Sequence, residues 1–317
     1  MVERLKIAIA KARERRANAG AGMSVQAAAP AQAGAAIASA PTTTATATAV
    51  AAQPKPAIDT AKRDANWEAL RPVALDLDLL AQERIVTAQK SDPAHVSFDM
   101  LRTRLTKVMQ AEGWRRIGIT SPTKGCGKTV VSANLGFSFG RHPESHTILL
   151  DLDLRSPRLS NILGRRDRLD LTQLLDGTVK PENYLKRVAP RFALVLNNRR
   201  VRDSAEFLQN TATLDAFERM SDAFNPDIEI YDLPPMLVGD DAVAFLPFLD
   251  AVIMVAAAGQ TTPQEIEECE ALISDQTTFL GVIMNKLSRP GSGSYYYYYS
   301  YSYGYGYGYG YDDDSKG

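Results

Sequence analysis

The chain has 317 residues, enough for one large domain or two modest ones. Its 36 basic and 37 acidic side chains nearly cancel, so no overall charge attracts the protein to nucleic acid or to a membrane surface. Two cysteines are too few for a framework of disulfides. No apolar run approaches the ~20 residues of a membrane-spanning helix, and the first residues lack the apolar core of a signal peptide. We therefore expect a soluble chain without a membrane span.

The first 59 residues differ in composition from the rest. Residues 1–16 place apolar side chains at helical spacing and basic side chains between them, which predicts a basic amphipathic helix. Such a helix either docks on a partner or on anionic lipid, or is merely solvated. Residues 17–59 consist mainly of Ala, Pro, Thr and Gln, with too few large side chains to offset the entropy of ordering. We expect a disordered linker there.

Residues 60–289 have the composition of a folded domain. A helical pattern ends near Gly113, and beyond it continuous apolar runs alternate with helix-like segments. The expected strands are 116–120, 147–152, 192–197, 227–232, 250–256 and 279–284, and the expected helices are 128–141, 204–223 and 263–276. Continuous apolar strands indicate burial on both faces. The fold class is therefore α/β, with a parallel sheet of the phosphate-loop NTPase type and helices on both faces.

A glycine-rich loop, residues 121–129, follows the first expected strand. It has the order of a phosphate-binding loop, although Pro122 stands where the usual pattern has its first Gly. Backbone N–H groups of such a loop and of the following helix favour an anion. Lys128 adds a positive charge for the outer phosphates, and Thr129 offers a hydroxyl to Mg²⁺. The residues expected to bind the nucleotide are Ser121, Lys124, Gly125, Cys126, Gly127, Lys128, Thr129 and Val130.

Acidic residues follow two of the expected strands. Asp151 and Asp153 come at the end of the 147–152 strand, and Asp232 ends another strand. Ligands of open α/β sheets bind at the carboxyl ends of the strands, so these acids should face the loop. We expect Thr129, Asp232 and Asp151 to hold Mg²⁺. Asp151, supported by Asp153, is the candidate base for an attacking hydroxyl, and Lys128, Asp151, Asp153 and Asp232 form the expected catalytic set.

Five further polar residues have less certain roles in the sequence. Asp241 is either an outer member of the site or a surface acid. Cys126 is either a thiol whose oxidation blocks nucleotide binding or a small tolerated side chain. His95, His142 and His146 show no metal-ligand spacing, and we expect them at the surface or in linkers.

The last residues, 290–317, form a tail of a different kind. Five consecutive tyrosines are followed by six that alternate with serine and glycine, and no aliphatic residue is present. Because they have so little to pack against, we expect the tail to be flexible and exposed. The tyrosines are Tyr295, Tyr296, Tyr297, Tyr298, Tyr299, Tyr301, Tyr303, Tyr305, Tyr307, Tyr309 and Tyr311.

These motifs together resemble the bacterial tyrosine kinases of capsule and exopolysaccharide synthesis. That family consists of phosphate-loop proteins related to the cell-division and plasmid-partition ATPases. Its loop often reads S-x-x-x-G-x-G-K-[ST], which residues 121–129 fit. Residues 148–157 fit its second motif, three apolar residues and D-x-D-x-R-x-P, and residues 232–235 fit D-x-P-P. Residues 295–311 look like the tyrosine cluster that the family autophosphorylates.

The resemblance implies a protein-tyrosine autokinase that uses ATP and Mg²⁺ to phosphorylate its own tail. Its role would be to regulate capsule or exopolysaccharide polymerisation and export. The implied partners are a membrane-bound polysaccharide chain-length regulator as activator, a tyrosine phosphatase and further copies of the chain, but no nucleic acid. The implied location is cytoplasmic, peripheral to the inner membrane through a partner.

The chain also departs from the family pattern. Family members often carry E-x-x-R-x-x-R before the first strand and use it to assemble a ring. Aligned on Arg102, this chain has Val96 and Asp99 in the first two positions, which puts a ring of this kind in doubt. Two alternative functions therefore stay open. One is an ATPase switch of the division or partition type without kinase activity, and the other is a nucleotide-bound, non-catalytic adaptor of the polysaccharide machinery.

Overall fold

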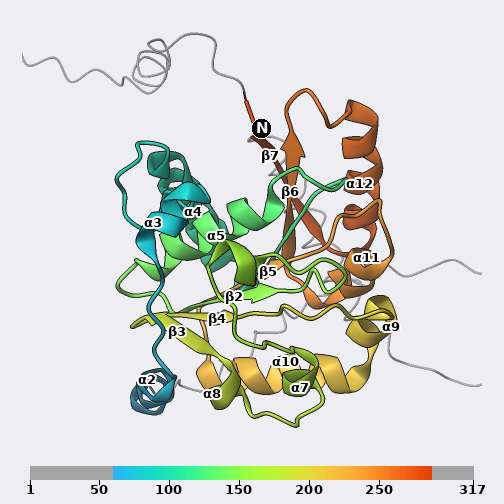
Figure 1. Cartoon of the computed structure of the whole chain (residues 1–317). Helices are drawn as coiled ribbons and strands as arrows, with labels where there is room; N and C mark the ends of the chain where they lie inside the picture. Colours follow the sequence, from blue (N-terminus) through green and yellow to red (C-terminus); the bar gives the residue numbers. More distant parts are fainter. Residues whose placement is uncertain (1–59, 288–317) are drawn as a thin grey trace, which may run out of the picture.

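The computed structural model describes residues 60–287 (Figure 1). The predictions for residues 1–16, 17–59 and 290–317 lie outside the described residues. Between residues 60 and 287, none of the helices has the length and apolar content that a membrane crossing requires.

A single seven-stranded sheet organises the fold, in the order β3-β4-β2-β5-β1-β6-β7. Neighbouring strands are parallel except for β3, which runs antiparallel to β4. The strands are β1 (Arg116–Thr120), β2 (Thr147–Asp151), β3 (Lys186–Ala189), β4 (Phe192–Val195), β5 (Ile228–Asp232), β6 (Ala251–Ala257) and β7 (Thr278–Asn285). The predicted α/β fold is confirmed, and the expected strands match six of these to within two residues at each end. The antiparallel strand β3 was not predicted.

Helices cover both faces of the sheet, as predicted (Figure 1). One face packs on α3 (Leu77–Gln82), α4 (His95–Glu112), α5 (Lys128–Gly140) and α6 (Leu159–Ile162). The other face packs on α2 (Thr60–Ala69), α7 (Thr172–Leu175), α8 (Pro181–Tyr184), α9 (Ser204–Gln209), α10 (Thr211–Phe224), α11 (Asp241–Phe245), η1 (Leu246–Phe248) and α12 (Pro263–Gln276). Each face thus has its own apolar core, and the central strands are buried between the two.

Local sequence explains where several helices begin and end. Gly113 ends α4 in the left-handed conformation, with φ of 69°, and its N–H donates to the Met109 carbonyl. A Thr262–Glu265 capping box begins α12. The single helix expected over 204–223 is wrong, because two helices meet at Asn210. The Asn210 side chain accepts the N–H of Ala212 and so caps the second helix.

The α2 helix is anchored to the sheet domain by one large side chain. Trp67 is 1% exposed, and its Nε1–H donates to the Phe224 carbonyl at 2.7 Å. The Trp67 and His146 rings lie 4.8 Å apart between centroids. His146 is buried, so its expected position at the surface or in a linker is wrong. Arg63 adds an ion pair with Asp227.

Asp227 makes this anchor sensitive to acid. Burial alone raises the pKa of its carboxyl, but hydrogen bonds from His146 and Arg63 outweigh burial and lower the pKa to about 2. A depressed carboxyl pKa stabilises the folded state above the unfolded value of about 3.9, and this stabilisation is lost as the pH falls toward 2. We expect Asp227→Asn to lower the free energy of unfolding at pH 7 and to do so by only about half as much at pH 3. Urea titrations at both pH values measure the difference, and an equal loss at both would contradict this assignment.

Candidate nucleotide-binding site

The loop between β1 and α5 has a backbone conformation that requires glycine at two positions. Gly125 and Gly127 have φ of 83° and 93°, which only glycine adopts without cost. A Cβ on Gly127 would lie 2.2 Å from Asn285 Nδ2. Asn285, at the end of β7, donates from Nδ2 to the Cys126 carbonyl at 2.9 Å. Asn285 was not predicted, although a polar residue at the carboxyl end of an expected strand was the available signal.

Lys128 begins α5 and points into a cluster of carboxylates. Its Nζ atom lies 2.8 Å from Asp153 Oδ2 and 3.7 Å from Asp232 Oδ1, and its side chain is 10% exposed. Burial alone lowers the pKa of this ammonium group, but the charges of Asp232 and Asp153 outweigh burial and raise the pKa. Lys128 is therefore a fixed positive charge beside the loop.

Asp151 and Asp232 are fully buried at the carboxyl ends of β2 and β5. They are direct partners in the register of the two strands, which brings the two carboxyl groups together. Burial raises the pKa of both carboxyl groups, and their mutual repulsion raises that of Asp151 further. Asp151 accepts the backbone N–H groups of Asp153 and Leu159 at 3.2 and 3.0 Å. The acids that the sequence placed at strand ends thus lie together beside Lys128.

One oxygen of this cluster has no partner. Asp232 Oδ1 lies 3.0 Å from Ser132 Oγ, whereas Asp232 Oδ2 is buried without a hydrogen-bond partner among the described residues. An unpaired buried carboxylate oxygen is costly, and a cation or its water would satisfy it. No group of three His, Cys, Asp or Glu side chains within residues 60–287 forms a metal site by itself. Mg²⁺ at phosphate loops is shared with the nucleotide and water, so the residues present fit such an ion.

The other residues expected at the loop occupy different environments. Ser121 is buried, and its Oγ–H donates to the Thr123 carbonyl at 2.8 Å. Thr129 is 8% exposed, Val130 is half-buried and Lys124 is exposed. The Cys126 thiol is 2% exposed and donates to the Thr123 carbonyl at 3.3 Å, as a small packed side chain would.

Asp241 is buried rather than at the surface. It begins α11, is 2% exposed and accepts a hydrogen bond from Ser204. Arg155 Nε lies 2.5 Å from Asp241 Oδ2, and this ion pair joins the segment after β2 to the one after β5. The alternative that Asp241 is a surface acid is wrong. The motif of residues 148–157 includes Arg155 but does not predict its partner.

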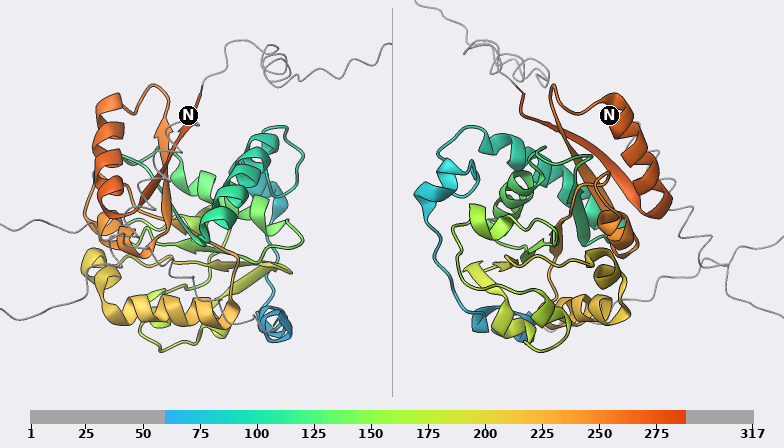
Figure 2. Two further views of the ribbon diagram at one scale, coloured as in Figure 1. Left: turned by 180° about the vertical axis from the view of Figure 1, so that it is seen from behind. Right: turned by 45° about the vertical axis from the view of Figure 1, so that its right-hand side comes forward.

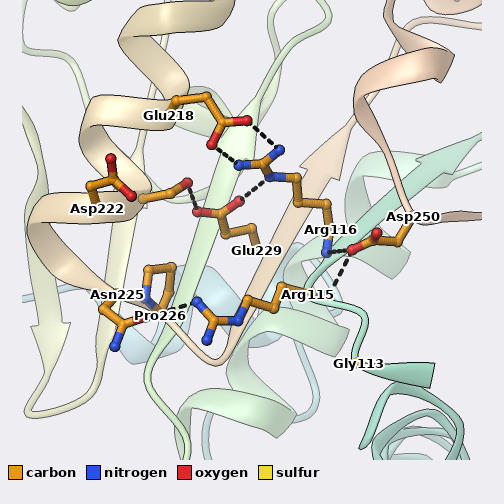
Figure 3. Close-up of a pocket in the computed structure, with 10 residues that line it drawn as sticks. Gly113, Arg115, Arg116, Glu218, Asp222, Asn225, Pro226, Glu229 and Asp250 are labelled. Carbon is orange, nitrogen blue, oxygen red and sulfur yellow. Dashed lines mark hydrogen bonds and ion pairs between the residues drawn. The ribbon is translucent and has the colours of Figure 1, made fainter. Parts of the chain in front are cut away.

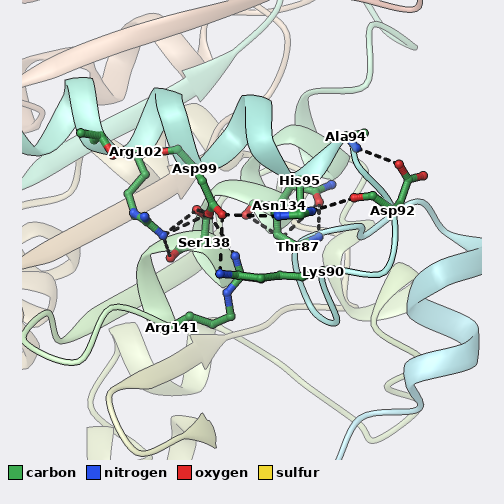
Figure 4. Close-up of polar contacts among 11 residues, drawn as sticks. Thr87, Lys90, Asp92, Ala94, His95, Asp99, Arg102, Asn134, Ser138 and Arg141 are labelled. Atoms are coloured by element: carbon green, nitrogen blue, oxygen red, sulfur yellow. Dashed lines mark hydrogen bonds and ion pairs between the residues drawn. The ribbon is translucent and has the colours of Figure 1, made fainter. Parts of the chain in front are cut away.

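The α4 helix carries a polar cluster around Asp99 (Figure 4). Asp99 Oδ1 lies 3.1 Å from Arg102 and 3.0 Å from Arg141, and it accepts Ser138 Oγ–H at 2.5 Å. Arg102 also donates to the Ser138 carbonyl at 2.9 Å. Burial alone raises the pKa of Asp99, but Ser138 and the two arginines together lower it. Arg102 is thus paired within its own chain.

The opposite end of the sheet holds a pocket of about 280 Å³ (Figure 3). It lies where β1 and β5 begin, so it is separate from the loop. Arg116 lies between Glu218 and Glu229 and stacks 4.0 Å from the centre of the Phe248 ring. Burial alone lowers the pKa of Arg116, but the two carboxylates outweigh it and raise the pKa. Arg116 is thus paired with both carboxylates, and the pocket is not part of the candidate nucleotide-binding site.

The fold and the site together define a phosphate-loop nucleotide-binding protein. No family model matches the chain. It is 30% identical over 174 residues to the tyrosine-protein kinase CpsD of Streptococcus pneumoniae serotype 4, a match that covers 54% of this chain and 75% of that relative. The chain belongs to the bacterial tyrosine kinases, as its motifs predicted.

Two further comparisons define how far this similarity extends. The chain is 28% identical over 219 residues to the succinoglycan biosynthesis transport protein ExoP of Rhizobium meliloti, which is 67% of this chain but only 27% of that relative. The chain therefore spans about a quarter of the length of such longer relatives. Among solved structures, the kinase domain of Escherichia coli tyrosine kinase ETK has a TM-score of 0.58 at 22% identity and covers 67% of this chain and 84% of that domain. This last likeness supports the fold.

Proposed function

We propose that the chain is an ATP- and Mg²⁺-dependent protein-tyrosine autokinase whose acceptors are tyrosines of residues 295–311. The observation that carries the proposal is the convergence of Lys128 with Asp151, Asp153 and Asp232 beside the loop. A fixed cation and carboxylates at one edge of a sheet suit phosphoryl transfer, which needs positioning and charge stabilisation above all. Membership of the bacterial tyrosine kinases supports the same activity.

Each residue of the site has a defined task in this proposal. Lys128 and the loop N–H groups neutralise the outer phosphates of ATP. Thr129, Asp232 and Asp151 would hold Mg²⁺, which supplies further charge neutralisation at the phosphates. Asp151, supported by Asp153, accepts the proton of the attacking tyrosine hydroxyl. The tyrosine oxygen bonds to the γ-phosphorus while the bond to the leaving ADP oxygen breaks, so the products are phosphotyrosine and ADP.

The cellular role follows from the relatives and forms part of the same proposal. ExoP is named as a transport protein of succinoglycan biosynthesis. We place this chain in capsule or exopolysaccharide synthesis, at the inner membrane, with a membrane-bound chain-length regulator as activator and a tyrosine phosphatase as its opponent. Assembly with further copies would bring the tail of one chain to the site of another. The pairing of Arg102 with Asp99 favours a contact other than the family's arginine-bearing helix.

The tail tyrosines provide the direct test of this function. We expect the purified chain with ATP, Mg²⁺ and its activator to accumulate phosphotyrosine, detected by antibody and mass spectrometry. Replacing all eleven tail tyrosines with phenylalanine should remove this signal, because the ring stays but the acceptor oxygen is lost. ATP binding should be unchanged in the same variant.

Three outcomes would contradict parts of this proposal. Phosphotyrosine that persists in the phenylalanine variant would place the acceptor outside the tail. ATP hydrolysis without phosphotyrosine would favour the switch of the division or partition type. Binding of labelled ATP with neither hydrolysis nor phosphotyrosine would favour the nucleotide-bound, non-catalytic adaptor.

A further inference from the structure

The strand β7 leaves one edge of the sheet open. Among the described residues it pairs with β6 alone and is the last strand in the order (Figure 2). All seven residues of β6 are buried, whereas six of the eight residues of β7 are only half-buried and Met284 is exposed. A strand at an edge presents backbone N–H and C=O groups that another extended segment can pair with.

This edge lacks two of the usual protections against strand addition. Residues 278–285 contain no charged residue and no proline, although an irregularity at Leu280 shifts the register with β6 before the pairing resumes over residues 281–285. Leu280 and Ile283 are only partly buried against the core on the α5 side. Met284 and Leu287 are 45% and 63% exposed, among the most exposed large apolar side chains of residues 60–287. A further strand at this edge would pair its open backbone groups and bury its exposed apolar side chains, and the tail begins next to it.

The sequence of the tail has the period of a strand. Residues 295–303 read Tyr-Tyr-Tyr-Tyr-Tyr-Ser-Tyr-Ser-Tyr, so every odd position is a tyrosine and the even positions become serine. Successive side chains of a strand point to opposite faces, which gives this segment one fully aromatic face. Tyrosine is also among the residues enriched in strands. The segment has nine residues, and β7 has eight.

The connection between the two segments is suited to a reversal of the chain. Residues 286–294 contain Pro290, Gly291 and Gly293 with three serines, which are the residues of turns. A connection of this length brings residues 295–303 back along β7 in the antiparallel direction. We propose that residues 295–303, when not phosphorylated, pair with the open edge of β7 in the same chain as an eighth strand of the sheet.

The position of this added strand links the tail to the nucleotide loop. The reversal occurs after Asn285, whose side chain donates to the Cys126 carbonyl. Tyr295 therefore lies next to the loop end of β7, and the later tyrosines follow β7 away from it. In this arrangement the tail covers the apolar edge and waits beside the site.

Phosphorylation would release the strand, a consequence that rests on the proposed function. Alternate residues of a strand are about 6.5–7 Å apart on one face. Each phosphate adds about 1.5–2 negative charges. Phosphates on successive odd tyrosines would repel one another and would have to leave water to stay against an apolar edge. The modified tail therefore leaves β7, while the unmodified tail returns to it.

Hydrogen exchange tests the docking without any catalysis. The chain is prepared without ATP and treated with a phosphatase, and it is compared with a chain that ends at residue 289. We expect the amides of β7 to exchange roughly tenfold faster in the shortened chain, because cross-strand pairing protects them, while the amides of β1 stay unchanged. Equal exchange of β7 in the two chains would overturn the proposal. In a control chain the tail keeps its composition but carries serine or glycine at the odd positions of residues 295–303. The β7 amides of this control must exchange as fast as those of the shortened chain.

A pair of engineered cysteines tests the direction of the strand and the choice of one chain over two. An antiparallel return after residues 286–294 places residue 296 opposite residue 284, within reach of a disulfide. The variant Met284→Cys with Tyr296→Cys, oxidised by oxidised glutathione, should form an internal disulfide in a monomer. The natural thiols, Cys126 and Cys269, are 2% and 0% exposed and give little background. A disulfide between two copies, or none, would overturn the intramolecular strand, and Met284→Cys with Tyr311→Cys must not cross-link.

The two proposals can fail separately. Both docking experiments run without ATP, so their failure leaves the kinase function standing. Absence of phosphotyrosine in the wild-type chain with its activator removes the kinase function but does not affect the exchange result.

Discussion

Replacing Lys128 with methionine is expected to lower the rate of tail phosphorylation by about 100- to 1,000-fold, the usual cost of removing one preorganised charge-stabilising group. Methionine keeps the length and apolar stem of lysine but loses the ammonium group, which lies 2.8 Å from Asp153 and 3.7 Å from Asp232. Nucleotide affinity should fall as well, because the buried carboxylates then face the phosphates without compensation. Phosphotyrosine accumulation and the Kd for labelled ATP measure the two effects.

A matched control distinguishes this effect from a general loss of a lysine. Lys180 is exposed ahead of α8, far along the chain from the loop, and Lys180→Met should phosphorylate like the wild type. Thermal unfolding of both variants establishes that each is folded. A folded Lys128→Met variant with wild-type phosphorylation would remove this residue from the proposed site.

Replacing Trp67 with alanine is expected to destabilise the folded domain by about 3–5 kcal/mol, as large-to-small substitutions of buried aromatic residues do. Trp67 is 1% exposed, packs on His146 and Phe224, and donates to the Phe224 carbonyl. The substitution leaves a cavity and an unpaired buried carbonyl, so both effects have the same sign. Urea denaturation measures the loss.

Two further variants calibrate this prediction. Trp67→Phe keeps most of the ring volume but not the hydrogen bond, and it should cost clearly less than alanine. Leu77→Ala changes a side chain that is 48% exposed and should stay within about 0.5 kcal/mol of the wild type. Alanine at position 67 without a measurable loss would show that α2 is not anchored by this residue.

The sequence was sufficient for those parts of the fold whose apolar runs are continuous. The strands β2, β4 and β6 are buried along their whole length, so their apolar runs are continuous and easily recognised. The strand β3 was missed because it has only four residues, begins with Lys186 and Arg187 and is half-buried. The break between α9 and α10 was missed because Asn210 suits a helix cap but does not interrupt the apolar pattern.

Site residues that belong to a local sequence motif could be predicted. Contacts between residues that are distant in the sequence could not. The loop and the strand-end acids could be placed because parallel strands end at one edge. The contacts of Asn285 with the loop, Ser132 with Asp232 and Arg155 with Asp241 join residues 86 to 159 positions apart, and no local pattern indicates them. The buried position of His146 depends in the same way on packing against Trp67.

The two edges of the sheet differ, and this difference limits how copies of the chain can aggregate. The edge at β3 is short, carries Lys186 and Arg187, and is bridged by Pro72, so it is a poor template for another strand. Growth of a fibre by edge-to-edge pairing requires an open edge at each end of the unit. Edge-to-edge pairing of the sheet in residues 60–287 can therefore join two copies through β7 but cannot continue from β3. When the tail leaves β7, the sheet offers one open edge and not two, which prevents unlimited growth through this sheet.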